Sequence, residues 1–321
     1  MNAPYTHIIP LPPHAVAISD ADEEVFLLYT RLAALKSEDN EDNSHFRGLG
    51  FLDAQQDTIQ VHVDLTPPTT ISPTIPKARH GRSAPRKAGG KGKGRQDEAI
   101  SLEFELFQDK TALRSRSGDT GSVLWRASID VARLVLQQTR FPTPDALFDS
   151  HKLSTARCIE LGAGTGLLAV ALGPLFRRYT ATDVPVLVPL LRKNISHTQR
   201  SRSSISAAAL DWMLPAHRQL PDDPLADPVD LILAVDCLYH PSLIPPLLST
   251  LSTLCIPGRT TVLVVSELRA EDVVREFLEG WLSRPREEGW RIWNVNGEGG
   301  KRLMGERYAV WMAWRAVEPE G

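Results

Sequence analysis

The sequence predicts an α/β protein: a seven-stranded, mostly parallel sheet with helices on both faces, preceded by an N-terminal extension that contributes β-strands. From residue 156 onward, short apolar runs typical of strands alternate with segments typical of helices, at the spacing of β-α-β units. Before residue 110, two segments alternate apolar and polar side chains with the period of half-buried strands. The length of 321 residues suits one large α/β domain or two small ones.

The two strand-like segments, residues 58–65 and 100–107, lie on either side of a long insertion. In each of them every second side chain is apolar, so one face of each strand is predicted to be buried. We expect the two strands to pair, because closure entropy rises slowly with loop length and a long insertion between them is tolerated. The predicted organisation is an extension over residues 1–65, an insertion over 66–98 and the main domain over 99–321.

The insertion is strongly basic. Between Thr66 and Gln96 there are eight Lys and Arg residues and no acidic residue, whereas the formal net charge of the whole chain is -3. Five prolines and five glycines lie between Pro67 and Gly94, and such a stretch cannot offset its ordering entropy by burying apolar surface. We therefore predict a disordered loop. It could bind nucleic acid or an acidic protein surface, act as a nuclear address, or be a solvated insertion without a partner.

The main domain is predicted to begin with a helix that starts near Ala127 and ends before Pro142, because its apolar residues share one helical face. Strands are then predicted at residues 157–161, 179–183, 205–210, 229–235, 259–266, 291–295 and 307–317. The helices predicted between them are residues 167–172, 186–194, 243–254 and 271–282. The clearest strand is 259–266, which is rich in β-branched residues, and the clearest helix is 271–282, whose apolar residues recur at helical spacing.

Composition excludes several classes of protein. No apolar run approaches the ~18 residues that a membrane-spanning helix needs. Cys158, Cys237 and Cys255 lack the spacing of a zinc site or a redox pair, so we expect neither a metal site nor disulfides, and a reducing compartment. The first thirty residues hold four acidic residues and no basic start, which argues against a secretory or mitochondrial leader. We expect a cytoplasmic monomer, with the nucleus as the alternative location.

In an open parallel sheet, ligands bind beyond the carboxyl ends of the strands. The first such end carries Gly162-Ala-Gly-Thr-Gly166, which joins a strand to a helix and lets the backbone approach a ligand closely. This turn departs from the dinucleotide fingerprint, because its third glycine comes one residue early. Glu160, two residues ahead of the turn, would repel a pyrophosphate but suits an ammonium group. We therefore expect a cationic ligand rather than a dinucleotide.

Acidic residues follow the next two strands. Asp183 lies 21 residues after Gly162, where an acid binds a ribose diol in this kind of site, although it could instead cap the following helix. Asp211 and Trp212 end the third strand. The acid could accept from an adenine amino group and the indole could cover the ring, with an ordinary core position as the alternative for Trp212.

The end of the fourth strand, at the centre of the sheet, carries Asp236-Cys-Leu-Tyr239. A carboxylate and a phenol three residues apart can face the same crevice, which predicts a reactive site. The alternative is an acid that caps the next helix beside a tyrosine at the rim. His240 is adjacent, but a lone histidine before a proline is more typical of a loop than of a catalytic base.

Together these motifs resemble the class I, seven-β-strand, Rossmann-like S-adenosylmethionine-dependent methyltransferases. Glu160-Leu-Gly-Ala-Gly-Thr-Gly166 is similar to their first motif and Asp183 to the acid of their second. Within that class, the sequence resembles the protein-lysine methyltransferases of the methyltransferase-like twenty-one and fungal elongation-factor type. The features that carry this likeness are Gly121-Ser-Val-Leu-Trp125 ahead of a helix, Asp211-Trp212, and Asp236-Cys-Leu-Tyr239, and it covers about residues 100–317.

The resemblance implies S-adenosylmethionine as cofactor and a protein substrate, with elongation factor 1-alpha as the first candidate. The residues that it implies for cofactor binding are Trp125, Glu160, Gly162, Ala163, Gly164, Asp183, Asp211, Trp212 and Val235. Val235 is a departure, because many relatives carry alanine there. Asp236 and Tyr239 are the implied catalytic residues. Asp236 would orient the lysine amine or accept its proton through water, and Tyr239 would hydrogen-bond the nitrogen or line its channel.

Three other functions stay open at this point. A nucleic-acid or small-molecule methyltransferase could use the basic loop to deliver an RNA. A nicotinamide-dependent oxidoreductase would use the same crevice, although the early third glycine and Glu160 argue against it. A non-catalytic scaffold could keep the fold and dock a partner through the loop.

Overall fold

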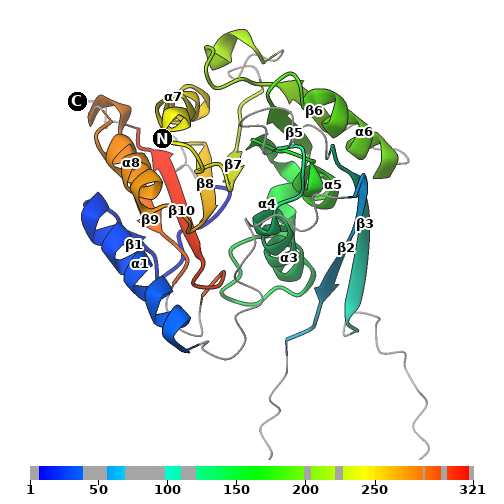
Figure 1. Ribbon diagram of the computed structural model, residues 1–321, viewed down its shortest axis with the longest axis horizontal. Helices are drawn as coiled ribbons and strands as arrows, with labels where there is room; N and C mark the ends of the chain where they lie inside the picture. The colour runs from blue at the N-terminus through cyan, green and yellow to red at the C-terminus, as the bar shows by residue number, and fades with distance from the viewer. Residues whose placement is uncertain are drawn as a thin grey trace, which may run out of the picture.

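The computed structural model describes residues 7–38, 56–68, 98–109, 121–198, 204–220, 227–284, 286–297 and 302–317. Its main feature is an eight-stranded sheet in the order β1-β9-β10-β8-β7-β4-β5-β6 (Figure 1). The strands of this sheet are β1 (Val16–Ala17), β4 (Arg157–Leu161), β5 (Arg178–Asp183), β6 (Ile205–Ala209), β7 (Leu231–Val235), β8 (Thr261–Glu267), β9 (Trp290–Asn294) and β10 (Tyr308–Arg315). The predicted α/β class is confirmed.

The sheet has one strand more than the sequence predicts. The additional strand is β1, which pairs antiparallel with β9 and places Val16 opposite Asn294. A strand of two residues is too short to give a periodic signal, so the pattern of the sequence does not reveal it. The seven predicted strands are all present, and their ends differ from the predicted ones by no more than two residues.

The parallel part of the sheet has a switch point. Strands β6, β5, β4, β7 and β8 run parallel, whereas β10 pairs antiparallel with both β8 and β9. The chain proceeds outward from β4 through β5 to β6 and then returns to β7 on the other side of β4. The carboxyl ends of β4 and β7 therefore flank the crevice at which open α/β sheets bind ligands.

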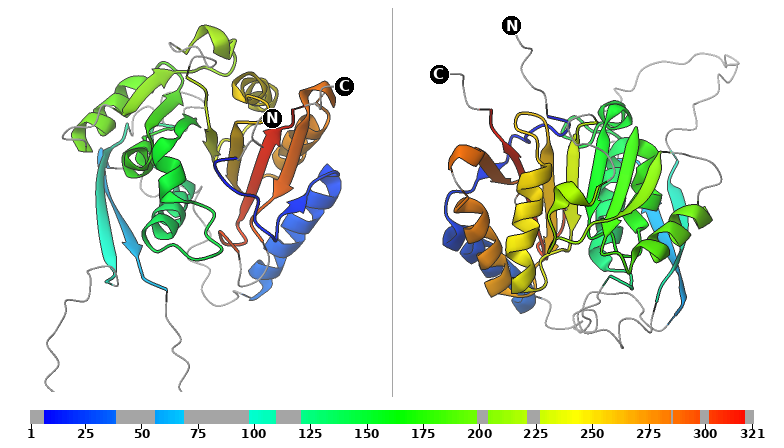
Figure 2. Two further views of the ribbon diagram at one scale, coloured as in Figure 1. Left: turned by 180° about the vertical axis from the view of Figure 1, so that it is seen from behind. Right: turned by 90° about the horizontal axis from the view of Figure 1, so that it is seen from above.

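Helices cover both faces of the sheet (Figures 1 and 2). One core joins the sheet to α3, α5 and α6, and the other joins it to α1, α7 and α8. Neighbouring residues of one strand enter different cores, as Cys158 and Ile159 do, because side chains alternate across a pleated strand. The helices are α1 (Ala21–Glu38), α3 (Arg126–Arg140), α4 (Ser150–Thr155), α5 (Leu167–Leu172), α6 (Val188–Thr198), α7 (Ile244–Leu254) and α8 (Glu271–Leu282), with 3-10 helices η2 (Gly173–Leu175), η3 (Ala216–Arg218), η4 (Pro241–Leu243) and η5 (Arg286–Glu288).

Helix α1 is the main element that the sequence analysis did not predict for the N-terminal extension. It packs along α8 and buries Val25, Leu28 and Leu32, which recur at helical spacing (Figure 1). Asp20 accepts from the backbone N–H of Glu23 at 3.1 Å, so the usual start signal was also present. In the part of the chain that the structure describes, no helix is long and apolar enough to cross a membrane.

Strands β2 (Thr58–Leu65) and β3 (Ile100–Phe107) form a separate two-stranded sheet. They pair antiparallel along their whole length, with Val61 opposite Phe104, which confirms the predicted hairpin. The buried face of β2 packs against α3, and β3 packs against α6. Most of the predicted basic loop, residues 69–97, lies outside the described residues.

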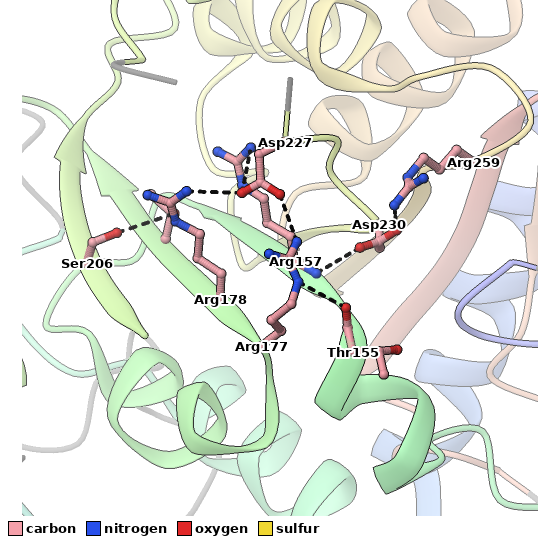
Figure 3. Close-up of polar contacts among 9 residues, drawn as sticks. Thr155, Arg157, Arg177, Arg178, Ser206, Asp227, Asp230 and Arg259 are labelled. Atoms are coloured by element: carbon pink, nitrogen blue, oxygen red, sulfur yellow. Dashed lines mark hydrogen bonds and ion pairs between the residues drawn. The ribbon is translucent and has the colours of Figure 1, made fainter. Parts of the chain in front are cut away.

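An arginine cluster holds together the amino ends of the parallel strands, at the edge opposite the switch-point crevice (Figure 3). Asp227 forms ion pairs with Arg157, Arg177 and Arg178, which lie at or next to the starts of β4 and β5. Asp230 accepts from the backbone N–H of Arg157 and pairs with the Arg259 guanidinium at 2.8 Å. The two aspartates thus connect the segments that enter β4, β5, β7 and β8.

Candidate active site

A cavity of about 430 Å³ opens at the carboxyl ends of β4, β5, β6 and β7. It lies at the switch point, where the topology predicts a ligand. The sequence-predicted site residues that line it are Trp125, Gly162, Ala163, Gly164, Asp183, Asp211, Trp212, Val235, Asp236 and Tyr239. Glu160 is the one predicted site residue outside this lining.

The glycine turn after β4 forms a tightly packed wall of the cavity. Gly162 and Gly164 have φ values of +66° and +55°, a region that L-residues with side chains rarely adopt. A Cβ on Gly164 would lie 3.1 Å from the carbonyl oxygen of Gly121. A Cβ on Gly162 would lie 3.0 Å from Cys237 Sγ and 3.3 Å from the Trp212 ring. Only glycine leaves the backbone accessible to a ligand here.

Asp183, at the end of β5, is held by the backbone on both sides of its carboxylate. One oxygen accepts from the Gly164 N–H and the other from the Val184 N–H, each at 2.8 Å. Helix α6 begins only at Val188, so these contacts do not have the geometry of the helix cap that was the alternative. The carboxylate therefore links the glycine turn to the end of β5 in the wall of the cavity.

Asp211 and Trp212 follow β6. Gln219 accepts from the backbone N–H of Asp211 and donates to its carbonyl, both at 2.8 Å, while the Asp211 side chain accepts from the Met213 N–H at 2.9 Å. The indole of Trp212 lines the cavity and also packs on the core of the α7 and α8 layer. Its Nε1–H is buried and has no hydrogen-bond partner among the residues that the structure describes, which leaves a donor for a ligand acceptor.

Glu160 lies outside the cavity lining, although the sequence analysis expected it to contact a ligand ammonium. Side chains alternate along β4, so Glu160 points to the same face as Cys158. It is buried and accepts from the Tyr179 hydroxyl at 2.8 Å. Burial raises the pKa of Glu160 to about 8; the Tyr179 hydrogen bond opposes this rise and the nearby charge of Asp183 adds to it. Its carboxyl is bound to Tyr179 and is not among the groups that line the cavity.

Asp236 has an unusual backbone conformation at the end of β7. Its φ is +59°, and it is the only residue other than glycine with a positive φ in the described part of the chain. Such a conformation costs roughly 1–3 kcal/mol and persists where surrounding contacts impose it. The Asp236 N–H donates to the Val265 carbonyl at 2.7 Å, and its side chain accepts from the Glu267 N–H at 3.3 Å. This strain at a strand end is typical of a functional position.

Tyr239 and His240 follow Asp236 in a loop. Tyr239 is exposed at the rim of the cavity, three residues beyond Asp236 in its wall. The sequence thus correctly places a carboxylate and a phenol at one crevice. His240 lies outside the lining, and its Nδ1 accepts from the Ser242 N–H at 3.2 Å, as the N-cap of η4. The histidine has a structural role in the loop.

Comparison with known proteins identifies the family. A family model described as lysine methyltransferase matches residues 108–281, more than half of the chain. The chain belongs to the lysine methyltransferase family. The resemblance drawn from the sequence motifs is confirmed by this match and by the names of its relatives.

Three proteins of similar sequence illustrate the relatives of this lysine methyltransferase family member. It is 31% identical over 137 residues to EEF1A lysine methyltransferase 3 of Xenopus tropicalis, covering 42% of this chain and 58% of that protein. It is 29% identical over 309 residues to ribosomal lysine N-methyltransferase 5 of Zygosaccharomyces rouxii, covering 82% and 88%. It is 33% identical over 179 residues to a Schizosaccharomyces pombe protein named diaminohydroxyphosphoribosylamino-pyrimidine deaminase, covering 55% and 41%. The chain spans about half the length of the Xenopus and fission-yeast proteins.

Arg269 is a charged residue of the methyltransferase cavity that the sequence analysis missed. It follows β8 by two residues, lines the cavity and contacts Asp236 through two hydrogen bonds of 2.7 Å. Arg269 could have been predicted, because the rule that ligands bind beyond the carboxyl ends of the strands also applies to the end of β8. An arginine on a surface loop is common, however, and only the fold shows that this one faces Asp236.

Proposed function

We propose that this protein transfers the methyl group of S-adenosylmethionine to a lysine side chain of another protein. The observation that carries the proposal is one cavity with two kinds of wall in a chain of the lysine methyltransferase family. One wall holds the glycine turn and Asp183, which suit a nucleoside with an amino-acid tail. The other holds Asp236 and Tyr239, which suit an amine.

The residues present fit the proposed cofactor. The cavity of about 430 Å³ falls in the range of small-molecule sites. A Cβ at Gly162 or Gly164 would be crowded, so these residues place backbone rather than side chains in the cavity wall. Trp212 supplies a buried N–H donor that has no partner in the described part of the chain. When bound, S-adenosylmethionine would supply an electrophilic methyl group on a positively charged sulfur.

Each group of residues has a proposed task. Backbone groups of Gly162, Ala163 and Gly164 would pack on the ligand, and the Asp183 carboxylate would accept from the ribose hydroxyls. Asp211, Trp212 and Val235 would surround the adenine, with the indole against its ring. Trp125, directly before α3, would close the cofactor side of the cavity.

The target amine must reach the cavity without its proton. A lysine in water has a pKa near 10.4, so little of it is neutral at physiological pH. Burial in a narrow site beside a cation lowers that pKa, because both effects disfavour a second positive charge. Asp236 would orient the amine in the cavity wall and the Tyr239 ring would line its entrance. The protein then acts mainly by alignment and exclusion of water.

The rim of the cavity supports a macromolecular substrate. Val184, Val186, Met213 and Tyr239 line the cavity, and each remains an exposed large apolar side chain. Apolar side chains that gather around a cavity mouth are typical of a surface that another protein covers. We propose elongation factor 1-alpha as the first substrate to test, since relatives are named for lysine methylation of EEF1A; a ribosomal protein is the second.

Labelled methyl transfer tests the proposal. Purified protein and tritiated S-adenosylmethionine are incubated with unmethylated elongation factor 1-alpha, or with ribosomal proteins, and mass spectrometry locates the modified residue. We expect the label to be located in a lysine, to remain after nuclease treatment and to be released by protease. Asp183→Ala should lower the rate by at least about tenfold, whereas Asp64→Ala, on the exposed face of β2, should not change it.

The outcomes separate the parts of the proposal. Label in a ribosomal protein alone would keep the lysine activity and reject the elongation factor as substrate. Label that disappears only with nuclease would show a nucleic-acid methyltransferase and reject the lysine activity.

A further inference from the structure

We infer that Arg269 is a positioning residue for the proposed methyl transfer and acts by fixing the Asp236 carboxylate at the cavity wall. The inference rests on the proposed function and adds a residue to it. Neither the motifs of the sequence nor the family match assigns a role to this arginine. Its contacts with Asp236, Glu267 and Trp125 carry the argument.

The guanidinium of Arg269 forms a bidentate contact, or fork, with the Asp236 carboxylate. Nη1 and Nη2 each lie 2.7 Å from a different oxygen of the Asp236 carboxylate. A bidentate pair of this kind fixes the plane of the carboxylate as well as its distance. The Asp236 side chain is 5% exposed and that of Arg269 29%, so the pair is largely shielded from water. The carboxylate is therefore held in one orientation.

Arg269 also connects three elements that meet at the cavity. Its Nη2 lies 2.6 Å from Glu267 Oε2, at the end of β8. Its guanidinium carbon lies 5.0 Å from the centroid of the Trp125 ring, at the start of α3, within cation–π distance. Asp236 itself ends β7. One side chain thus sets the relative positions of two strand ends and an aromatic cavity wall.

The strained backbone of Asp236 explains why the fork is needed. At φ +59° the residue needs contacts that impose this conformation. The Val265 carbonyl and the Glu267 N–H hold its backbone and side chain, and Arg269 supplies the two short charge-assisted bonds. Without Arg269 the carboxylate would keep only the 3.3 Å contact with Glu267 among these side-chain bonds, and its direction would no longer be set.

The arginine also determines what the carboxylate can do. Asp236 and Glu267 contribute two negative charges and Arg269 one positive charge, so with both acids ionised the group retains one net negative charge for an incoming amine. Both Asp236 oxygens already accept hydrogen bonds from the Arg269 guanidinium. The carboxylate is therefore placed to orient the amine, whose proton leaves to water.

Steady-state kinetics and cofactor binding test the inference. Arg269→Met removes the charge at similar length, and Arg269→Lys keeps the charge without the fork. Both should lower kcat by about tenfold or more and change the dissociation constant of S-adenosylmethionine by less than about threefold. Arg275→Met is the matched control, because Arg275 is similarly exposed (34%) but lies on α8, where it pairs with Glu271 and Asp22; it should leave kcat unchanged.

A double-mutant cycle shows whether Arg269 acts through Asp236. If it does, Arg269→Met combined with Asp236→Asn should lower kcat no further than the more damaging single variant, within about threefold. Losses that multiply would overturn the inference. So would a normal kcat in Arg269→Met, or full recovery of kcat in Arg269→Lys, since charge alone would then suffice.

A cofactor-free measurement separates this inference from the proposed function. In NMR spectra of the protein without ligand, the Arg269 guanidinium protons should be protected from solvent exchange and lose that protection in Asp236→Asn. Rapid exchange in the wild-type protein would reject the fork, whatever the activity. Protected protons in a protein that methylates no lysine would instead reject the proposed function and leave the fork intact.

Discussion

Glu160 shows how one residue can belong to a motif without lining the cavity. Its side chain leaves β4 on the face of Cys158 and meets the Tyr179 hydroxyl in the core, while the glycine turn that follows it lines the cavity. Burial raises the pKa of Glu160 to about 8, from an ordinary value of 4.5. The carboxyl is therefore protonated in the folded protein at neutral pH.

This pKa predicts a pH dependence of stability. The unfolded chain loses the Glu160 proton near pH 4.5, but the folded protein keeps it up to about pH 8. The stability that this group contributes is complete below pH 4.5 and is lost as the pH rises toward 8. The full shift corresponds to roughly 5 kcal/mol. Glu160→Gln, which keeps the shape without the charge, should flatten the decline of unfolding free energy over this window in urea titrations.

Glu103→Gln provides the control for this measurement. Glu103 lies exposed on β3, and its pair with His62 is a surface contact. The control variant should reproduce the wild-type pH profile. A Glu160→Gln profile parallel to that of the wild type would contradict the assignment of a buried, protonated carboxyl.

Gly164 makes a second prediction at the residue scale. Alanine there would face the Gly121 carbonyl at 3.1 Å in a backbone conformation with φ +55°. We expect Gly164→Ala to lose about 1–2 kcal/mol of stability and to bind S-adenosylmethionine at least about tenfold more weakly. Calorimetric titration and urea unfolding measure the two effects. Gly305→Ala is the control, because its Cβ would enter open space, and equal losses in both variants would contradict the argument.

At the scale of elements, the arginine cluster of Figure 3 fastens the amino ends of the parallel strands. Arg157 begins β4 and its side chain is buried, yet its guanidinium contacts the Asp227 carbonyl and lies 3.7 Å from the Asp227 carboxylate. Arg177 and Arg178 reach the same carboxylate from the start of β5. The cluster therefore couples two strands whose opposite ends form the cavity.

Removal of Asp227 should cost more than removal of an ordinary surface aspartate. Asp227→Ala leaves the buried Arg157 without its carboxylate, and we expect a loss of about 2 kcal/mol in urea unfolding. Asp22→Ala, which breaks an exposed pair between α1 and Arg275, should cost less than about 1 kcal/mol. Equal losses in the two variants would show that the cluster is only a solvated surface network.

At the scale of the whole molecule, the cavity lies where two separately packed cores meet the edge of one sheet. Its walls come from the ends of β4 to β8 and from the segment before α3. These segments are brought together only in the folded chain, so a ligand of the cavity binds the folded state and not the unfolded one. Ligand binding and global stability are therefore linked.

The link gives a direct prediction. S-adenosylhomocysteine at about 100 times its dissociation constant should stabilise the protein by about 2.7 kcal/mol, which raises the melting temperature by roughly 5 °C or more. Asp183→Ala should abolish the shift, and a nicotinamide dinucleotide at the same concentration should produce none. A shift with the dinucleotide alone would favour the oxidoreductase that the glycine spacing argued against.

The order of the elements and most of the cavity wall follow from the sequence. Period-two and helical spacings are local, so they identified seven strands of the large sheet and paired β2 with β3. Residues such as Asp183 and Asp236 were found because parallel strands bring their carboxyl ends to one edge. Helix α1 carried a usable local signal in Val25, Leu28 and Leu32.

Other features depend on contacts between distant segments. The pleat of β4 turned Glu160 toward Tyr179, and the two-residue β1 exists only through its pairing with β9. Arg269 and Asp236 are 33 residues apart, and no pattern in the sequence links them. The sequence alone therefore determined most of the chemical groups that line the cavity. The tertiary structure decided which of them touch, because a guanidinium and a carboxylate meet only when the ends of two neighbouring strands are fixed in one sheet.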